Sequence, residues 1–595
     1  MTSYRLSEGG LIDRQNALAF SFDGKRMEGM AGDSLASALL ANGHQLVGRS
    51  FKYHRPRGIL TAGAAEPNAL VTIGSGGRTE PNTRATMQDL YAGLEARSQN
   101  RWPSLNFDMG SVTGLLSPFL GAGFYYKTFM WPAPLWEKLY EPLIRRAAGL
   151  GKATYDVDPD SYEKCWAHCD LLVIGSGPAG LAAALTAGRA GARVILVDEQ
   201  SAAGGALLSE TASIGGASGP AFAATLIAEL CSLENVRILT RTTAFGWYDG
   251  NVFGAVQRVQ KHLAAPVADV PVERLWRIAA KQALLATGAE ERPLVFGGND
   301  IPGVMMAGAM RSYLNRYGVA PGRSVAIFTS NDSGYALAHD LGAAGVHVEA
   351  IVDSRPDGAT SGYTGPARVL KGAVVTDAHG GKALSSITVR QGGKMDRMQV
   401  DALAMSGGFS PIIHLACHRG GKPQWSDEHA CFLAPEKLNG LALAGSAVAT
   451  DGIRACLLDG AEKASALVRS LGFNASPARF GAVEGETLCP PAKPLWSIAG
   501  CKGKAFVDYQ NDVHTRDLGL AVREGYGDVE LAKRYTTNGM ATDQGKLSNV
   551  NAIGLLAEAR GTTPDRIGTT TFRPFYTPVS FGALTGSSHG KPFQP

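Results

Sequence analysis

The sequence predicts an α/β protein built around two nested strand–helix–strand units, with a smaller module before them and another after them. Residues 170–174 form a continuous apolar run, followed by a glycine-rich turn, an alanine-rich segment and a second apolar run at 193–197. Such runs are typical of parallel strands buried on both faces. A second set of the same kind begins at 324–328 and ends at 348–352. At 595 residues the chain is also too long for one core, so several domains are expected.

The composition is that of an ordinary globular protein, with 45% hydrophobic and 18% charged residues and a formal net charge of +4. Because the basic residues are scattered, nucleic-acid binding is not expected. The most apolar early stretch, 112–131, is broken by Pro118 and Lys127 and makes a poor membrane span. The N-terminus lacks the apolar segment of a secretory signal, and the eight cysteines include no C-x-x-C pair. We therefore predict reduced thiols, no metal site and a cytoplasmic protein that does not enter a membrane.

Residues 1–100 are expected to form a small β-rich module. The segment 19–25 alternates like a strand and ends in a turn, and 33–41 has the pattern of a capped amphipathic helix ending before Asn42 and Gly43. Residues 101–165 are rich in aromatic residues and proline. We predict that they form a connector or a contact with another subunit.

The strongest functional motif is the G-x-G-x-x-G sequence from Gly175 to Gly180, which lies directly between a predicted strand and a predicted helix. In a dinucleotide-binding (Rossmann) unit the first glycine allows the tight turn, the second lets a pyrophosphate approach the backbone, and the third lets helix and strand pack closely. The helix N-terminus adds unpaired N–H groups for the phosphates. Asp198 ends the second strand, where a carboxylate would accept hydrogen bonds from a ribose, and its neighbours Glu199 and Gln200 could share that role. The sequence therefore predicts a dinucleotide site in a domain formed by residues 166–320 and 405–470.

Two later segments favour a flavoprotein-like architecture with two dinucleotide-binding domains. Residues 285–289, which include Gly288, and residues 443–447, which include Gly445 and Ser446, resemble the strands that return to the cofactor in such proteins. Flavoproteins usually carry an acid at the position of Ser446, so NAD and FAD both stay open for the Gly175 pocket. The inserted domain, 321–404, has the sequence 329–334 in place of a glycine loop and lacks the first two glycines. We predict a structural unit that has lost its ligand, with a bound nucleotide as the less favoured alternative.

The last part of the chain is divided into a proline-rich linker at 471–500, a small helical module at 501–560 and a tail at 561–595. Several sequence segments resemble segments of the alpha subunits of the heterotetrameric sarcosine oxidase family and follow that family's domain order. These segments are 49–71, 286–288, 406–411, 506–513 and 535–546. The resemblance implies NAD at the first glycine loop, FAD on a smaller beta-type subunit, FMN at the interface between the two, and small gamma- and delta-type subunits. Carried over by position, the nucleotide site comprises Gly175, Gly177, Ala179, Gly180, Asp198, Glu199, Gln200, Gly205, Ala206, Ala244, Gly288, Gly445, Ser446, Asp451 and Ile453.

The flanking modules resemble the iron–sulfur domains of related oxidoreductases but lack the expected ligands. Cysteines would be expected near Thr61, Glu66 and Ala69 in the ferredoxin-like N-terminal module, and near Asp508, Gln510, Asp543 and Ser548 in the C-terminal module; all of these positions hold other residues. Because thiolates hold such clusters, we expect both modules to be degenerate and to carry no iron–sulfur cluster. The segment 536–546 combines hydroxyls, two glycines and Lys546, a set that could bind the FMN phosphate or form a loop packed on a partner.

We predict a subunit of a flavin-dependent enzyme that demethylates a secondary N-methyl amino acid, such as sarcosine, to the amino acid and formaldehyde. The cofactors carry this chemistry, so no catalytic residue is assigned in this chain. Longer family members continue beyond 579–584 into a folate-binding domain, which is expected here on a separate chain or not at all. The alternatives are an N-methylglutamate, opine- or proline-type dehydrogenase complex, a self-contained NAD(P)H-dependent reductase, which would need a redox dithiol, and a non-catalytic scaffold with a structural nucleotide.

Overall fold

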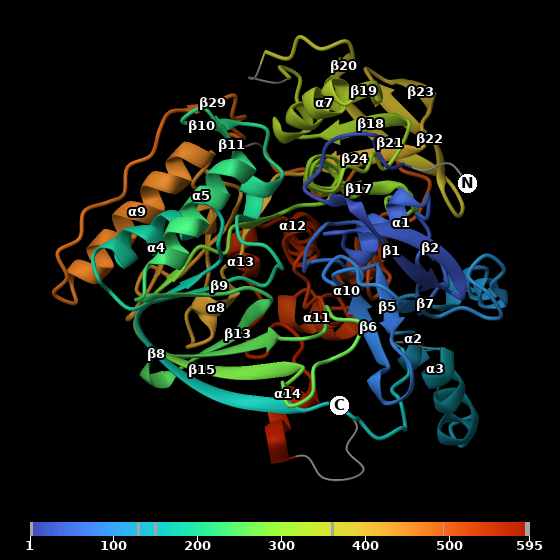
Figure 1. The fold of residues 1–595 in the computed structure, drawn as a ribbon. Helices are drawn as coiled ribbons and strands as arrows, with labels where there is room; N and C mark the ends of the chain where they lie inside the picture. The colour runs from blue at the N-terminus through green and yellow to red at the C-terminus, as the bar shows by residue number, and fades with distance from the viewer. Residues whose placement is uncertain (1–3, 128–130, 148–150, 359–361, 492, 589–595) are drawn as a thin grey trace. The chain divides into compact units, whose positions relative to one another are not determined.

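The computed structural model describes residues 4–127, 131–147, 151–358, 362–491 and 493–588 (Figure 1). The chain divides into two compact units. The first unit contains residues 1–154, 291–408 and 493–570, and the second contains residues 155–290, 409–492 and 571–595. Each unit is therefore assembled from three separate stretches of the chain.

The second unit is organised by a seven-stranded sheet in the order β12-β9-β8-β15-β14-β13, with β28 paired to β15. Its parallel part joins β8 to β9 and β15, β9 to β12, and β15 to β28. The strands β14 and β13 extend it in antiparallel fashion. The predicted α/β class is confirmed by this sheet and its helices. The elements are β8 (Tyr162–Ile174), α4 (Pro178–Arg189), β9 (Val194–Val197), α5 (Gly219–Ser232), β12 (Val236–Leu239), β13 (Thr242–Tyr248), β14 (Val252–Arg258), β15 (Glu273–Leu285), β28 (Leu441–Leu443) and α9 (Ile453–Arg469).

The strand β8 is longer than the apolar run that predicted it. From Glu163 to His168 its residues alternate between less and more exposed positions, whereas the residues from Cys169 to Ile174 are all buried. Alternation is the pattern of a strand with one face toward water, and a continuous apolar run is the pattern of burial on both faces. The prediction found only the half of β8 that is covered on both sides.

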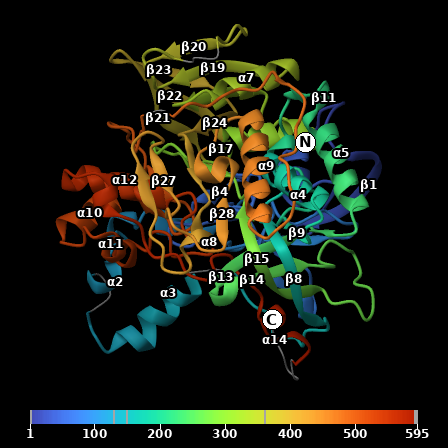
Figure 2. The ribbon, with the colours of Figure 1, turned by 90° about the vertical axis from the view of Figure 1, so that its left-hand side faces the viewer.

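The helices α4 and α9 lie side by side against this sheet, as both ribbon views show (Figures 1 and 2). They approach closely, since a Cβ built on Gly460 would lie 2.1 Å from the carbonyl oxygen of Ala179. The alanines of α4 are fully buried in the core of this unit. The alanine-rich composition of the segment is therefore explained by close helix packing. Smaller elements of the unit are β10 (Ser213–Ile214), β11 (Ala217–Ser218), β29 (Val483–Glu484), β26 (Gln424–Ser426), β27 (Cys431–Leu433), α8 (His414–Cys417) and α14 (Phe581–Thr585).

The first unit contains a five-stranded sheet in the order β2-β1-β7-β5-β6 and a second, parallel sheet in the order β17-β24-β18-β19-β20. One hydrophobic core joins the sheets and the helices between them. The predicted helix at 33–41 is confirmed as α1 (Leu35–Ala41), capped by Ser34 and ended by Asn42. The remaining elements are β1 (Asp13–Phe22), β2 (Lys25–Ala31), β5 (Leu70–Ile73), β6 (Glu80–Arg84), β7 (Glu95–Ser98), β17 (Val304–Met306), α6 (Ala307–Arg311), β18 (Ser324–Thr329), α7 (Ser333–Ala343), β19 (His347–Asp353), β20 (Arg368–Lys371), β21 (Ala373–Gly380), β22 (Leu384–Gln391), β23 (Lys394–Gln399) and β24 (Ala402–Ser406).

The C-terminal part of the first unit is helical, with α10 (Thr515–Arg523), α11 (Val529–Thr536) and α12 (Asn549–Arg560) after the short strands β30 (Phe506–Asp508) and β31 (Val513–His514). The connector predicted at 101–165 contains the short helices α2 (Phe124–Lys127) and α3 (Glu141–Ala147), and its last residues already belong to β8. In the described part of the chain, every helix is too short or too polar to cross a membrane.

Candidate functional site

The glycine loop of the second unit joins β8 to α4 with the geometry that its sequence predicts. Gly175 has φ +101°, and a Cβ on it would lie 2.3 Å from the carbonyl oxygen of Ala286. A Cβ on Gly180 would lie 1.8 Å from the carbonyl oxygen of Gly175. Gly177 differs from both, because no atom lies within 4 Å of its added Cβ. Two glycines are thus required for packing, and the third leaves space beside the backbone where a ligand can approach.

This open glycine is the N-cap residue of α4, with Pro178 as the first residue of the helix. The N–H groups in the first turn of a helix have no partner within the helix. They carry the positive end of the helix dipole, which favours phosphate oxygens. The loop therefore has the shape and the charge of a pyrophosphate site.

The backbone at Gly204 and Gly205 adjoins the same loop. The N–H of Gly204 donates to the carbonyl oxygen of Ser176 at 3.1 Å. A Cβ on Gly205, which has φ +53°, would lie 2.7 Å from the Cα of Gly177. The structure thus places Gly205 and its neighbour Ala206 beside the predicted phosphate position, where a side chain at Gly205 would collide with the loop.

Asp198 follows β9 and lies against the loop. Its Oδ2 accepts hydrogen bonds from the N–H and the hydroxyl of Ser176 at 2.8 Å and 2.6 Å, and its Oδ1 accepts from the N–H of Gln200 at 2.8 Å. A carboxylate can accept about four hydrogen bonds, so the oriented side chain still has capacity for a ribose hydroxyl. The backbone of Glu199 is held separately, since its carbonyl oxygen accepts from Arg258 at 2.8 Å. Ser176, which orients the acid, was not singled out from the sequence.

The returning segment, 445–453, also reaches the loop. A Cβ on Gly445 would lie 2.8 Å from the Cβ of Ala179, and the N–H of Gly445 donates to Asp459 at 2.7 Å. The hydroxyl of Ser446 donates to the carbonyl oxygen of Thr450 at 3.2 Å. Ser446 is thus engaged within its own turn.

Two predicted residues at the start of α9 contact the chain itself. The N–H of Ile453 donates to Glu486 at 2.6 Å, and Asp451 accepts from the N–H of Cys489 at 2.6 Å. A carboxylate therefore already lies at the N-terminus of α9. Glu486 is 33 residues away from Ile453 in the sequence, so no local pattern could have identified this contact.

Two further predicted residues are linked to the site through strands. Ala244 lies on β13, and the residue that begins this strand, Thr242, donates its N–H to the carbonyl oxygen of Asp198 at 2.7 Å. Gly288 follows β15, has φ +74°, and has no atom within 4 Å of an added Cβ. The predicted nucleotide residues other than Lys546 thus all belong to the second unit, and contacts among the described residues tie the glycine loop to Asp198, Gly205 and Gly445.

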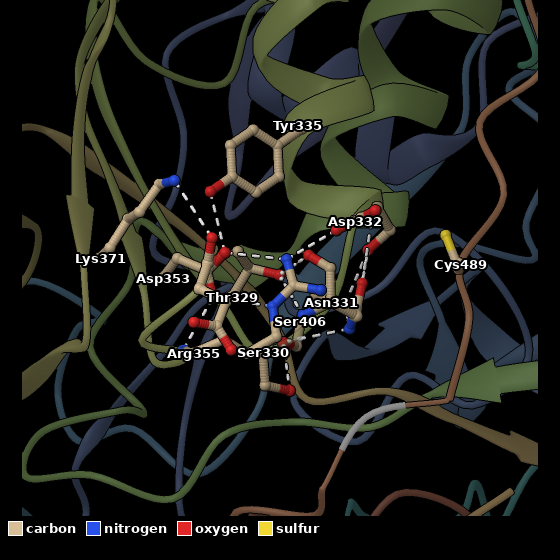
Figure 3. A network of polar contacts seen from close by, with 12 residues as sticks. Thr329, Ser330, Asn331, Asp332, Tyr335, Asp353, Arg355, Lys371, Ser406 and Cys489 are labelled. Atoms are coloured by element: carbon tan, nitrogen blue, oxygen red, sulfur yellow. Dashed lines mark hydrogen bonds and ion pairs between the residues drawn. The ribbon is translucent and has the colours of Figure 1, made fainter. Parts of the chain in front are cut away.

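The corresponding loop of the first unit, between β18 and α7, is filled by its own side chains (Figure 3). Asn331 stands where the second glycine would be; its side-chain oxygen accepts from the N–H of Ser333 at 2.9 Å and its amide donates to Ser406 at 2.9 Å. Asp332 is fully buried and pairs at 2.6 Å with Arg355. Arg355 also pairs with Asp353, at the end of β19. Among the described residues, the side chains of this loop therefore hydrogen-bond to one another and to the ends of β19 and β24.

A buried acid lies next to this loop. Glu291 accepts hydrogen bonds from the N–H of Gly308 at 2.7 Å and from the hydroxyl of Ser333 at 3.3 Å. Burial raises the pKa of Glu291 to about 7, against the lowering effect of these hydrogen bonds. The group thus favours its neutral form at a pH where an exposed glutamate is ionised.

In the N-terminal module, a carboxylate occupies the loop where cluster cysteines were expected. Glu66 is fully buried and accepts from the N–H groups of Leu60, Thr61, Asn68 and Ala69 and from the hydroxyl of Thr61. Burial raises the pKa of Glu66, and the backbone donors oppose that shift.

In the C-terminal module, the structure joins three of the four positions where cysteines were expected. Asp508 accepts from the N–H of Gln510 at 2.9 Å, and Gln510 accepts from the N–H of Asp543 at 3.0 Å. Burial, followed by the charge of Asp543, raises the pKa of Asp508 to about 7. Lys546 adjoins this group, and its ammonium donates to the carbonyl oxygen of Asp543 at 3.4 Å.

Three family models match parts of the chain. Residues 15–101 match a 2Fe-2S iron-sulfur cluster binding domain, residues 169–355 match pyridine nucleotide-disulphide oxidoreductases, and residues 502–588 match the sarcosine oxidase A3 domain. The first of these matches contradicts the expectation that the chain has no iron–sulfur cluster, and that expectation is withdrawn. The expectation rested only on the absence of cysteines at a few ligand positions, whereas the family model matches the sequence pattern of the whole domain.

The residues of this domain do not fit a cluster held by thiolates. Residues 15–101 contain no cysteine, and the carboxylate of Glu66 takes the backbone N–H groups of the loop. Because thiolates are the usual ligands of iron–sulfur clusters, no reaction step is derived through one.

Relatives with full-length similarity to this chain are alpha subunits. The sarcosine oxidase subunit alpha of Rhizobium meliloti (strain 1021) is 71% identical over 595 residues, covering 100% of this chain and 60% of the relative. That of Corynebacterium sp. (strain P-1) is 39% identical over 622 residues, covering 100% of this chain and 59% of the relative. The chain thus spans about 60% of the length of these relatives.

Among solved structures, an L-proline dehydrogenase from P. horikoshii is similar to this chain, with a TM-score of 0.68 and 21% identity. The alignment covers 97% of this chain and 99% of the other. This likeness shows that the two chains share a fold.

Proposed function

Because the chain belongs to the family of sarcosine oxidase alpha subunits, we propose that it is the nucleotide-binding large subunit of a flavin-dependent enzyme that oxidises an amine. The observation that carries the proposal is the glycine loop of the second unit. Gly177 is open at the N-terminus of α4, while Asp198 is oriented beside it by Ser176. This arrangement suits the pyrophosphate and ribose of a dinucleotide.

NAD is the dinucleotide that this pocket favours over FAD. Ser446 stands where flavoproteins usually carry an acid, and its hydroxyl is engaged by Thr450. Glu486 supplies a carboxylate at the start of α9, where it would favour the positively charged ring of oxidised NAD over a neutral flavin ring. Ile453 and Asp451, two residues of the set carried over by family resemblance, lie at this start of α9.

The substrate we propose is a secondary N-methyl amino acid such as sarcosine. Transfer of a hydride from its N-methyl carbon to the FAD of a partner subunit, with loss of the nitrogen's proton, would give an imine, and hydrolysis of the imine would give the amino acid and formaldehyde. A smaller FAD-binding beta-type subunit would hold the substrate, with small gamma- and delta-type subunits completing the assembly and a folate-binding domain outside this chain. The role of this chain is then to bind and orient. We also place the enzyme in the cytoplasm, where its eight free thiols stay reduced.

The segment at Lys546 is proposed to bind the phosphate of FMN at the contact with the partner. Gly539 and Gly545 have positive φ angles there, and their backbone N–H groups donate to Asp508 at 2.7 Å and to Asp543 at 3.3 Å, so a phosphate would have to take over these donors from the carboxylates. Lys546 adds a positive charge to this segment. Replacement Lys546→Ala should lower the FMN content of the assembled enzyme while the nucleotide of the second unit is retained.

The test of the main proposal is the replacement Gly177→Val in the full chain. The nucleotide released by denaturation is identified and counted by mass spectrometry. The wild-type chain should yield a dinucleotide close to one per chain, and the variant should yield almost none, because the valine side chain fills the space beside the loop.

A matched control is Gly63→Val, since Gly63 also has no atom within 4 Å of an added Cβ but lies in the first unit. This control should keep the wild-type nucleotide content. Equal content in the Gly177 variant and the wild type would show that the nucleotide lies elsewhere.

A further inference from the structure

Two lysines and a histidine gather around the ring of Tyr53 in the first unit. The Nζ of Lys504 lies 3.7 Å, and the Nζ of Lys52 lies 4.9 Å, from the centroid of this ring. The ring of His514 stacks on it with a centroid distance of 6.3 Å. The lysines are more than 400 residues apart in the sequence, so the fold itself brings the two mutually repelling ammonium groups together.

The carboxylate closest to Lys52 is already engaged. Asp517 accepts hydrogen bonds from the N–H groups of Ala122 at 2.9 Å and His514 at 3.2 Å. Its distance to the Nζ of Lys52 is 4.0 Å, which is too long for a hydrogen bond. The ion pair therefore leaves the three N–H donors of Lys52 available.

Two other carboxylates nearby are held by Arg55. Asp512 accepts from Arg55 at 2.6 Å and from the N–H groups of Lys52 and Tyr53 at 3.2 Å each. Asp300 pairs with Arg55 at 3.4 Å. Within the residues that the structure describes, the ammonium groups of Lys52 and Lys504 consequently have no hydrogen-bond acceptor.

Asp512, Asp300 and Asp517 act on these ammonium groups by charge, but none of them accepts a hydrogen bond from one among the described residues. The side chain of Lys52 is only 9% exposed, and Lys504 is half-buried. Burial lowers the pKa of Lys504, and the charge of Lys52 lowers it further, against the raising effect of the nearby carboxylates. Burial also lowers the pKa of His514, against the charge of Asp517; its buried Nδ1 has no hydrogen-bond partner among the described residues and lies 3.5 Å from the carboxylate of Asp517. Buried charges are normally paired.

We propose that Lys52 and Lys504, together with Arg516, bind a phosphate group beside Tyr53. Arg516 is exposed in the first turn of α10, next to His514, and its charge acts on that histidine. A phosphate monoester carries a charge of about −1.5 to −2 and three acceptor oxygens, which suits several separate cations better than a carboxylate does. The ligand is inorganic phosphate or a phosphate monoester, with FMN as the monoester tested; lysine-dependent binding of FMN here would place its phosphate beside Tyr53 and not at Lys546. This site is separate from the dinucleotide pocket of the second unit and does not depend on it.

The experiment is isothermal titration of the full chain with inorganic phosphate and, in a second arm, with FMN. The wild-type chain should bind at least one of them at a single saturable site whose affinity falls with rising salt. Lys504→Gln and Lys52→Gln should each weaken binding at least tenfold, whereas Lys504→Arg should restore most of it. The exposed Lys394, also in the first unit, provides the control Lys394→Gln, which should bind like the wild type.

The two arms distinguish the sources of the phosphate. Lysine-dependent binding of FMN alone identifies a nucleotide ligand, and equal dependence for both identifies a general phosphate site. Absence of saturable binding in both arms, or equal binding by the wild type and Lys504→Gln, would overturn the proposal.

Thermal unfolding gives a second readout: loss of a repelled charge should leave Lys504→Gln as stable as the wild type. Marked destabilisation would instead assign Lys504 to packing against Tyr53. The nucleotide content of the second unit, measured in parallel, tests the proposed function separately.

Discussion

The buried acid Glu291 should make the stability of the first unit depend on pH, and Glu291→Gln should remove that dependence. Its pKa is raised from 4.5 to about 7, mainly by burial. A group with a raised pKa in the folded state contributes stability below its unfolded value, and this contribution is lost as the pH rises through the folded value. The shift corresponds to about 3 kcal/mol of the free energy of unfolding, lost between about pH 4.5 and pH 7.

The variant keeps a side-chain oxygen that can accept from Gly308 but cannot ionise. At pH 8 it should therefore be more stable than the wild type, by up to about 3 kcal/mol, and at pH 5 the two should differ much less. The assay is urea denaturation of both chains at pH 5, 6, 7 and 8, followed by a probe of the first unit. The exposed Glu8 supplies the control Glu8→Gln, which should follow the wild type at every pH. The same pH dependence in Glu291→Gln and in the wild type would refute the assignment.

Three further changes test the packing and the polar contacts described above. Gly180→Ala should destabilise the second unit by about 3 kcal/mol or more in thermal unfolding, because the new Cβ would meet the carbonyl oxygen of Gly175. The control Gly177→Ala, whose Cβ meets no atom, should leave the unfolding midpoint nearly unchanged. A similar loss of stability in both variants would contradict the packing role assigned to Gly180. Asp198→Ala should weaken dinucleotide binding by about 1–3 kcal/mol in titration calorimetry, and an unchanged affinity would exclude Asp198 from the site. Glu66→Gln should lower the unfolding temperature of the first unit, because an amide nitrogen cannot accept from the N–H groups that donate to the carboxylate. An unchanged unfolding temperature would show that these N–H groups do not need the carboxylate.

The sequence was a good guide where function depends on residues close together in the chain. The need for glycine at positions 175 and 180 follows from one turn between a strand and a helix, and the structure has the close contacts that explain it, while the space beside Gly177 is open. The boundaries of β18 and β19 were predicted to within one residue for the same reason. The resemblance to sarcosine oxidase alpha subunits was likewise confirmed.

Contacts between distant segments were beyond the reach of sequence patterns. Glu486 meets the start of α9 only because the chain turns back after that helix. The grouping of Lys52 with Lys504 depends on the assembly of the first unit from separate stretches. The cluster prediction was wrong for another reason: the identity of a few ligand positions was taken as evidence about a whole domain, and residues 15–101 match that domain's family.

The length and register of β8 determine which mutations this strand can tolerate. Its partner β15 follows it with a constant offset, from Tyr162 opposite Glu273 to Ile174 opposite Leu285. A single inserted residue in β8 would exchange its buried and exposed faces and displace the glycine loop from the end of the sheet. Substitutions at the exposed positions of its outer half, such as Lys164 and Trp166, leave this alignment intact. The strand should therefore accept many replacements over evolution or in a library of variants, and almost no insertions or deletions.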